Sequence, residues 1–174
     1  MQLNWTKPHA SELSTYQKKY IDLVPEGDLN QILENNFQTT LKLVANLSKE
    51  KLNYRYAEGK WCIPELLIHI MDCERIFSYR ILCIARGDKT PLPGFDENNY
   101  AKNSNANERN FTEILEEFQS VRNSTLTLLK SLNNKTALQK GICNNTEISV
   151  QQIAYMLAGH ELHHQTVLKE KYLS

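Results

Sequence analysis

The sequence predicts an all-α fold, a four-helix bundle in a single domain that spans residues 1–174. The chain has 174 residues with only 6 glycines and 5 prolines, a composition that disfavours a turn-rich all-β fold. Four long stretches each place apolar residues at helical spacing along one face. Because none of these stretches can bury its apolar face alone, we expect them to pack together as a bundle.

The first two stretches have recognisable ends. Asp28 is a suitable N-cap for a helix whose apolar pattern continues to Leu47. The second stretch begins at Trp61–Glu65, where Pro64 suits the first helical turn, and Gly87 is a natural stop. The residues predicted to be buried on these two helices are Leu29, Ile32, Leu33, Phe37, Leu41, Val44, Leu47, Leu66, Leu67, Ile70, Cys73, Ile76, Phe77, Ile81 and Ile84.

The other two stretches follow a long connection. The third runs from about Asn107 to Leu132, and the fourth opens at Ser149 with Gln152 three residues later, which is capping-box spacing. The connection from Asp88 to Asn107 exceeds the roughly 2–8 residues usual between bundle helices, so it could cross over the bundle or form a lid. Residues 1–25 are expected to be an N-terminal extension packed on the bundle, with a short helix around Glu12–Asp22.

Charge and composition exclude several kinds of partner. Lys and Arg together number 20, as do Asp and Glu, so the chain lacks the basic excess with which proteins bind nucleic acid. No apolar run approaches the roughly 18 residues of a membrane span, and the polar segment Met1–Tyr20 lacks the apolar core of a signal peptide. The 4 cysteines form no CxxC pair, so we expect a cytoplasmic protein with reduced thiols.

Three histidines fall on faces that the apolar pattern predicts to be buried. His160 and His164 lie four residues apart on the face that carries Leu157, and His69 follows Leu66 by three. Buried imidazoles are costly unless they are satisfied, and a divalent metal ion would satisfy all three. Three histidine ligands leave a coordination position open, as in catalytic sites. The alternative is a bundle whose core histidines are only hydrogen-bonded.

Glu161 lies beside this histidine pair. It could act as a general base near the metal or orient a metal ligand, and the alternative is a carboxylate with a structural role between helices. The run His160–His164 also matches the H-E-x-x-H motif of zinc proteases. Val167 and Glu170 occupy the positions at which the longer form of that motif needs glycine and histidine, so we do not expect a protease.

Two residues of the second helix are further candidates. Arg80 lies near the buried face and could bind an anionic group of a substrate. Cys73 lies one turn from His69 on the same face, where it could be a fourth ligand or a small buried thiol.

Taken together, these motifs resemble the DinB/YfiT-like superfamily from about Tyr20 to the end of the chain. The matching segments are KWCIPELLIHIMDCER at 60–75, Tyr79-Arg80, ARGD at 85–88, PLPGFDE at 91–97, GHELHH at 159–164 and KYL at 171–173. Cys73 departs from the pattern, since a threonine or similar small residue is expected there.

The resemblance implies an up-down-down-up bundle with a metal site at His69, His160 and His164. It also implies a homodimer that acts on a small molecule. Some related proteins are S-transferases that use a low-molecular-weight thiol, and others are described as metal-dependent hydrolases. The family binds different metals; zinc or nickel is favoured here over iron, manganese or copper. The prediction is therefore a metal-dependent enzyme of transferase or hydrolase type. The alternative is a non-catalytic, stress-associated metal-binding bundle, which would have no accessible pocket.

Overall fold

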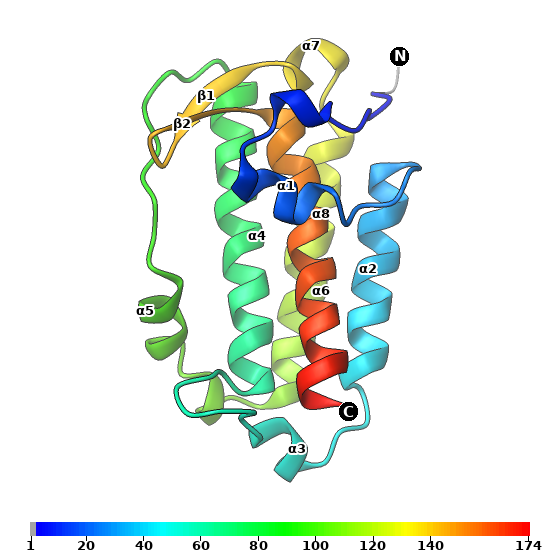
Figure 1. Cartoon of the computed structure of the whole chain (residues 1–174), viewed down its shortest axis with the longest axis vertical. Coiled ribbons are helices and arrows are strands. Elements are labelled where there is room, and N and C mark those ends of the chain that lie inside the picture. The colour runs from blue at the N-terminus through cyan, green and yellow to red at the C-terminus, as the bar shows by residue number, and fades with distance from the viewer. Residues whose placement is uncertain (1–2) are drawn as a thin grey trace.

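The computed structural model describes residues 3–174 and confirms the four-helix bundle (Figure 1). Its long helices are α2 (Leu29–Val44), α4 (Ile63–Ala85), α6 (Phe111–Lys130) and α8 (Val150–Val167), and a π-helical turn at Leu168–Tyr172 continues α8. The shorter elements are α1 (Thr15–Ile21), α3 (Lys49–Asn53), α5 (Glu97–Lys102), α7 (Asn134–Ala137) and the strands β1 (Lys140–Cys143) and β2 (Thr146–Ser149). Over residues 3–174, no helix has the length and apolar character needed to cross a membrane.

The helices follow the up-down-down-up order. In Figure 1, α2 and α8 run in one direction and α4 and α6 in the other. The two middle helices are parallel because the connection after α4 returns along the whole bundle, through α5, before α6 begins. Helix α4 packs against α6 and α8, and α2 packs against the same two helices.

The predicted helix starts are confirmed where a capping side chain was recognised. The carboxylate of Asp28 accepts a hydrogen bond from the backbone N–H of Gln31 at 2.8 Å, and Ser149 and Gln152 cap the start of α8 reciprocally. The third helix begins later than the predicted start near Asn107, because Asn110 caps α6 and the helix starts at Phe111. A 3₁₀ turn at Ala106–Glu108 precedes it.

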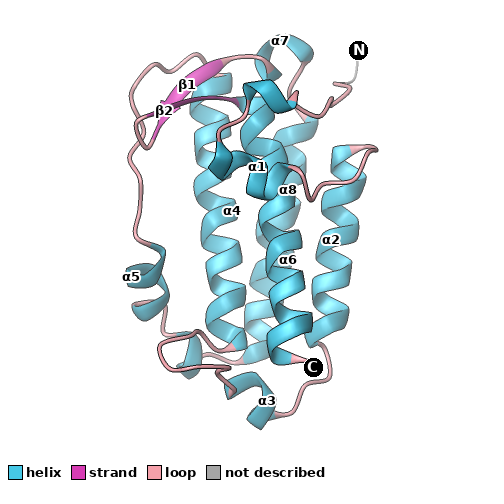
Figure 2. Ribbon diagram, in the orientation of Figure 1, coloured by secondary structure: helices cyan, strands magenta, loops and turns pink. Residues whose placement is uncertain are grey.

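A β-hairpin, which the sequence pattern did not predict, lies at one end of the bundle (magenta in Figure 2). Its turn residues Asn144 and Asn145 have φ of 48° and 61°, the left-handed conformation that two-residue hairpin turns require. The hairpin also binds the long connection, since Leu92 accepts a hydrogen bond from the backbone N–H of Asn144 and donates one to Ile142. The connection is therefore tied to the bundle end.

The bundle interior consists of two apolar clusters with buried polar side chains where the clusters meet. One cluster lies toward the hairpin and includes Ile81, Leu129 and Leu157. The other lies toward α3 and includes Phe118 and Leu168. The buried polar side chains between them are Asn36 and Thr40 on α2, His69 and Glu74 on α4, Arg122 and Thr125 on α6, and His160, Glu161 and Gln165 on α8. The candidate site lies at this polar level.

The N-terminal segment packs on the bundle through α1, which contacts α8. Gly159 allows this close approach: a Cβ atom at that position would lie 2.1 Å from the backbone oxygen of Tyr20. The glycine before His160 therefore brings Tyr20 next to the histidines.

Candidate metal centre

The three predicted histidines come together between α4 and α8. The Nε2 atom of His160 lies 3.2 Å from Nε2 of His69 and 3.1 Å from Nε2 of His164. One ligand atom from each residue lies within 4.8 Å of the others, and His69 and His160 are buried. Helical spacing explains the geometry, because residues four apart on α8 face α4 together.

These separations fit a divalent metal ion. Zinc binds imidazole nitrogen at about 2.0–2.1 Å in tetrahedral geometry, which places neighbouring ligand nitrogens roughly 3.3 Å apart. The two Nε2 separations in the structure, 3.2 Å and 3.1 Å, are close to that value. Three neutral imidazoles that converge on one point cannot all hydrogen-bond to one another. The geometry thus supports a divalent metal better than a hydrogen-bonded histidine cluster.

Aromatic rings and one thiol surround the imidazoles. The Trp61 ring lies 4.5 Å from the His69 ring, between centroids, and the Tyr20 ring lies 5.5 Å from the His160 ring. The sulfur of Cys73 lies 3.7 Å from Nε2 of His69, but the cluster of mutually close ligand atoms consists of the three histidines. The position of Cys73 fits a small buried thiol beside the site.

Burial keeps the imidazoles neutral, which is the form that binds metal. Loss of hydration lowers the pKa of His69 from 6.5 to about 4. The same cause, with repulsion from the neighbouring histidines, lowers the pKa of His160 and His164 well below 6.5.

These lowered pKa values predict that the metal-free protein loses stability in acid. Below about pH 6.5 the unfolded chain binds protons at the three histidines while the folded chain does not, so protonation favours unfolding. Each histidine should contribute about 1.4 kcal/mol per pH unit, from pH 6.5 down to the folded-state pKa, about 4 for His69. Urea unfolding in EDTA at several pH values measures this slope. The slope of unfolding free energy against pH should be smaller in His69→Gln than in the wild type and unchanged in His9→Gln. An equal slope in the wild type and both variants would contradict the prediction.

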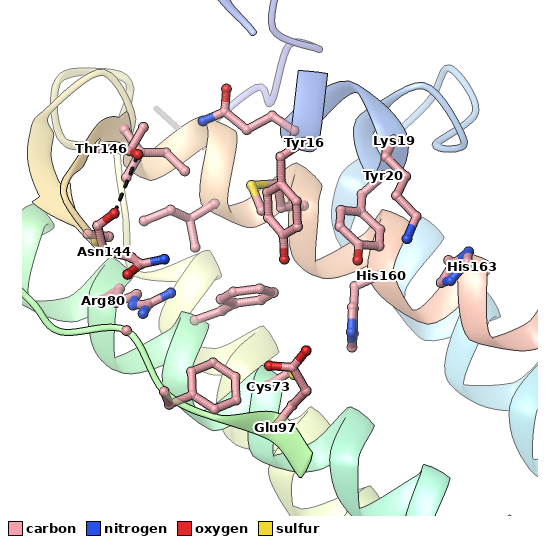
Figure 3. Close-up of a pocket in the computed structure, with 18 of the residues that line it drawn as sticks. Tyr16, Lys19, Tyr20, Cys73, Arg80, Glu97, Asn144, Thr146, His160 and His163 are labelled. Carbon is pink, nitrogen blue, oxygen red and sulfur yellow. Dashed lines mark hydrogen bonds between the residues drawn. The ribbon is translucent and has the colours of Figure 1, made fainter. Parts of the chain in front are cut away.

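The histidines form one wall of a cavity of about 740 Å³ (Figure 3). Its other walls come from α1, the hairpin and the connection that carries α5, and the labelled side chains in Figure 3 surround the open space. They include the hydroxyl groups of Tyr16 and Tyr20 and the carboxylate of Glu97. The site is therefore accessible to a small molecule.

Glu161 is not part of this cavity. It is fully buried, accepts a hydrogen bond from the Thr40 hydroxyl at 2.7 Å, and forms an ion pair with Arg122 at 2.7 Å. Residue 161 follows His160 around the helix by about 100°, so its side chain lies toward α2 and α6 while the histidines lie toward α4. The structure thus places it in a structural ion pair and not beside the metal ligands, where a general base would be needed.

The structure places Arg80 in the cavity wall, where the sequence predicted a binding residue. It also adds residues that the sequence pattern did not identify. His163, which lies off the stripe of metal ligands, packs its ring 5.7 Å from that of Tyr20 and lines the same cavity. Glu97 and Thr146 belong to the connection and the hairpin, which lack the periodicity of helices. The available signals for Glu97 were its place in the family segment at 91–97 and the preceding Asp96, whose side chain caps α5.

Comparison with known proteins agrees with the fold and with a metal-dependent protein. Residues 32–168 match the DinB superfamily. A protein of Oceanobacillus iheyensis named "Putative metal-dependent hydrolase OB0413" is 31% identical over 128 residues, which are 72% of this chain and 73% of that one. The structure of YfiT from Bacillus subtilis, described as a probable metal-dependent hydrolase with an unusual four-helix bundle topology, matches with a TM-score of 0.72. That match has 17% identity and covers 96% of this chain and 91% of the YfiT chain. This chain belongs to the DinB superfamily.

Proposed function

We propose that this protein is a metal-dependent hydrolase of a small organic molecule, with His69, His160 and His164 as the metal ligands. The observation that carries the proposal is that three Nε2 atoms converge at the wall of a 740 Å³ cavity. Closed structural sites surround the metal with four protein ligands, whereas catalytic sites keep a position for water or substrate. The names of the related proteins support the same reaction class.

The chain supplies groups suited to hydrolysis around the ligands. A divalent ion held by His69, His160 and His164 would supply a Lewis acid that activates water at neutral pH. Burial raises the pKa of Tyr20, so its hydroxyl keeps its proton and can donate a hydrogen bond to an oxygen that gains negative charge. The carboxylate of Glu97 faces the cavity (Figure 3) and can accept a proton.

Zinc or nickel is our choice for the metal. Neutral imidazole suits both ions, and the nitrogen separations of 3.2 Å and 3.1 Å fit ligand bonds of about 2 Å to either ion.

Transfer of a low-molecular-weight thiol is the second candidate, and the position of Glu161 favours it. The carboxylate that adjoins the histidines in sequence is held by Arg122 and Thr40, so hydrolysis would depend on Glu97 to take a proton from water. A thiol needs a general base less than water does, because coordination to a metal alone would deprotonate it. A non-catalytic metal-binding protein is disfavoured by the size of the cavity.

The two reactions predict different products from the same protein. Metal-free protein would be reloaded with zinc or nickel and incubated with a panel of small esters, amides and lactones in ¹⁸O-labelled water. A hydrolase incorporates the label into the product, and His69→Ala should lower the rate at least 100-fold. The exposed-histidine variant His9→Ala is the control. Label-free products, together with metal-dependent consumption of cysteine by an alkylating reagent, would replace the hydrolase proposal with the transferase.

A further inference from the structure

We propose that Arg80 and the hairpin turn form a subsite for an anionic group of the substrate, such as a carboxylate, at the end of the cavity away from the metal ligands. This inference rests on the proposed function, because it names the class of substrate for the same site. The substrate would be an elongated small molecule with its reacting bond at the histidines and its anionic group at Arg80.

Arg80 is a buried cation with no anionic partner in the described structure. Arg80 is 8% exposed. Its side chain nevertheless forms no ion pair with any carboxylate among residues 3–174. The other buried arginine, Arg122, pairs with two glutamates. A cation without a counter-charge at the wall of a cavity attracts anions, so an anion from outside the chain would be a favoured partner of Arg80.

Part of the Arg80 side chain remains available for a ligand. Its Nη2 atom donates a hydrogen bond to the backbone oxygen of Pro93 at 2.7 Å, and that contact fixes the guanidinium against the connection. Its Nε and Nη1 atoms have no hydrogen-bond partner in the part of the chain that the structure describes. An arginine held in this way presents N–H donors in a fixed plane, which suits a carboxylate or phosphate.

The hairpin turn places polar groups beside this arginine. Asn144 and Thr146 line the cavity with Arg80, and Figure 3 shows the three side chains at one side of the open space. Gly94 lets the connection approach the turn, since a Cβ there would lie 2.4 Å from Oδ1 of Asn144. The Asn144 amide can donate a further hydrogen bond to an anion, whereas the Thr146 hydroxyl donates to the backbone oxygen of Asn144 at 3.5 Å and holds the turn.

The two ends of the cavity differ in chemistry, and this difference defines the substrate. Figure 3 shows His160 and His163 at the opposite side of the cavity from Arg80 and Asn144. Between them the walls carry the apolar side chains of Phe77, Ile153 and Met156, together with the Tyr16 hydroxyl and the Glu97 carboxylate. A molecule that fills the cavity would therefore have an apolar middle and an anionic end.

Titration with straight-chain dicarboxylates, from malonate to sebacate, tests the subsite. With metal-free protein, calorimetry should detect binding that Arg80→Met weakens by roughly tenfold to a hundredfold. Arg80→Lys should recover part of it, because the charge remains. Arg86→Met is the control, since Arg86 is exposed at the end of the same helix. With zinc-loaded protein, affinity should peak at one chain length, because the second carboxylate then reaches the histidines.

Two results would overturn the subsite. One is equal affinity of the metal-free wild type and Arg80→Met for every dicarboxylate. The other is an Arg80→Met variant that loses binding only in proportion to a loss of folded protein in urea unfolding, which would make Arg80 a structural tie to Pro93. Binding to metal-free protein does not depend on hydrolysis, so it would stand even if no substrate of the panel were hydrolysed.

Discussion

Replacing Arg122 with methionine is expected to lower the free energy of unfolding by about 3–5 kcal/mol, the range measured when one partner of a buried ion pair is removed. Arg122 is fully buried at the level where the two apolar clusters meet. Its guanidinium joins three helices, because it binds Glu74 on α4 at 2.8 Å, Glu161 on α8 at 2.7 Å and the backbone oxygen of Leu33 on α2.

The loss of stability in Arg122→Met would come from the two glutamates that remain unpaired. Glu74 and Glu161 are 2% and 1% exposed, and desolvation already raises the pKa of Glu161. Without Arg122 the two carboxylates lack a counter-charge in the interior, and one would have to take up a proton or draw in water. Methionine fills a similar volume and can pack against Phe37 and Phe118, which now lie against the guanidinium. The effect would therefore report charge more than cavity formation.

A surface arginine is the matched control for this variant. Arg75 is 44% exposed and pairs with Glu117 and Asp72, so Arg75→Met should change the free energy of unfolding by less than about 1 kcal/mol. Adding Glu74→Gln and Glu161→Gln to Arg122→Met removes the unpaired charges and should restore part of the stability. Urea unfolding of all four proteins measures these values. Equal losses in Arg122→Met and Arg75→Met would contradict the role of Arg122.

The buried ion pair also explains what the sequence could and could not predict. The histidines could be predicted because each stands where helical spacing calls for an apolar residue. His69 follows Leu66 by three, and His160 follows Leu157 by three. Glu161 was harder to place because nearly every residue of α8 from Val150 to Glu161 is buried, so this helix has more than one buried face. A charged residue there can face a different neighbour from the histidine next to it.

The position of Arg122 in the sequence also indicates a buried ion pair. It stands four residues after Phe118 and four before Leu126, both of which are buried, and Glu74 stands four after Ile70 in the same way. A cation and an anion at such positions on two helices indicate a buried pair, but which residues pair depends on helix packing. The hairpin had no such signal: strands of four residues are too short to show alternation clearly, and only Asn144-Asn145 marked the turn.

Replacing His160 with alanine is expected to abolish the stabilisation that metal gives to the fold. A ligand present at 1,000 times its Kd stabilises the folded state by about 4 kcal/mol. Zinc or nickel at such a concentration should therefore raise the unfolding temperature of the wild type by the amount that corresponds to about 4 kcal/mol. His160 is central to the cluster, because its Nε2 contacts the Nε2 atoms of both other histidines. The change can be measured by thermal unfolding with and without added metal, and by metal content after dialysis.

His163→Ala separates metal binding from the general effect of losing a histidine on this helix. His163 packs on the rings of Tyr20 and His164 but lies outside the cluster of converging ligand atoms. Its variant should keep the metal-dependent rise in unfolding temperature, whereas His69→Ala and His164→Ala should lose most of it. If His163→Ala lost the rise and His69→Ala kept it, the assigned ligand set would be wrong. Because metal and protons compete for the same imidazoles of the folded protein, the rise should also shrink as the pH falls toward their folded-state pKa, about 4 for His69, which a structural histidine cluster without metal would not produce.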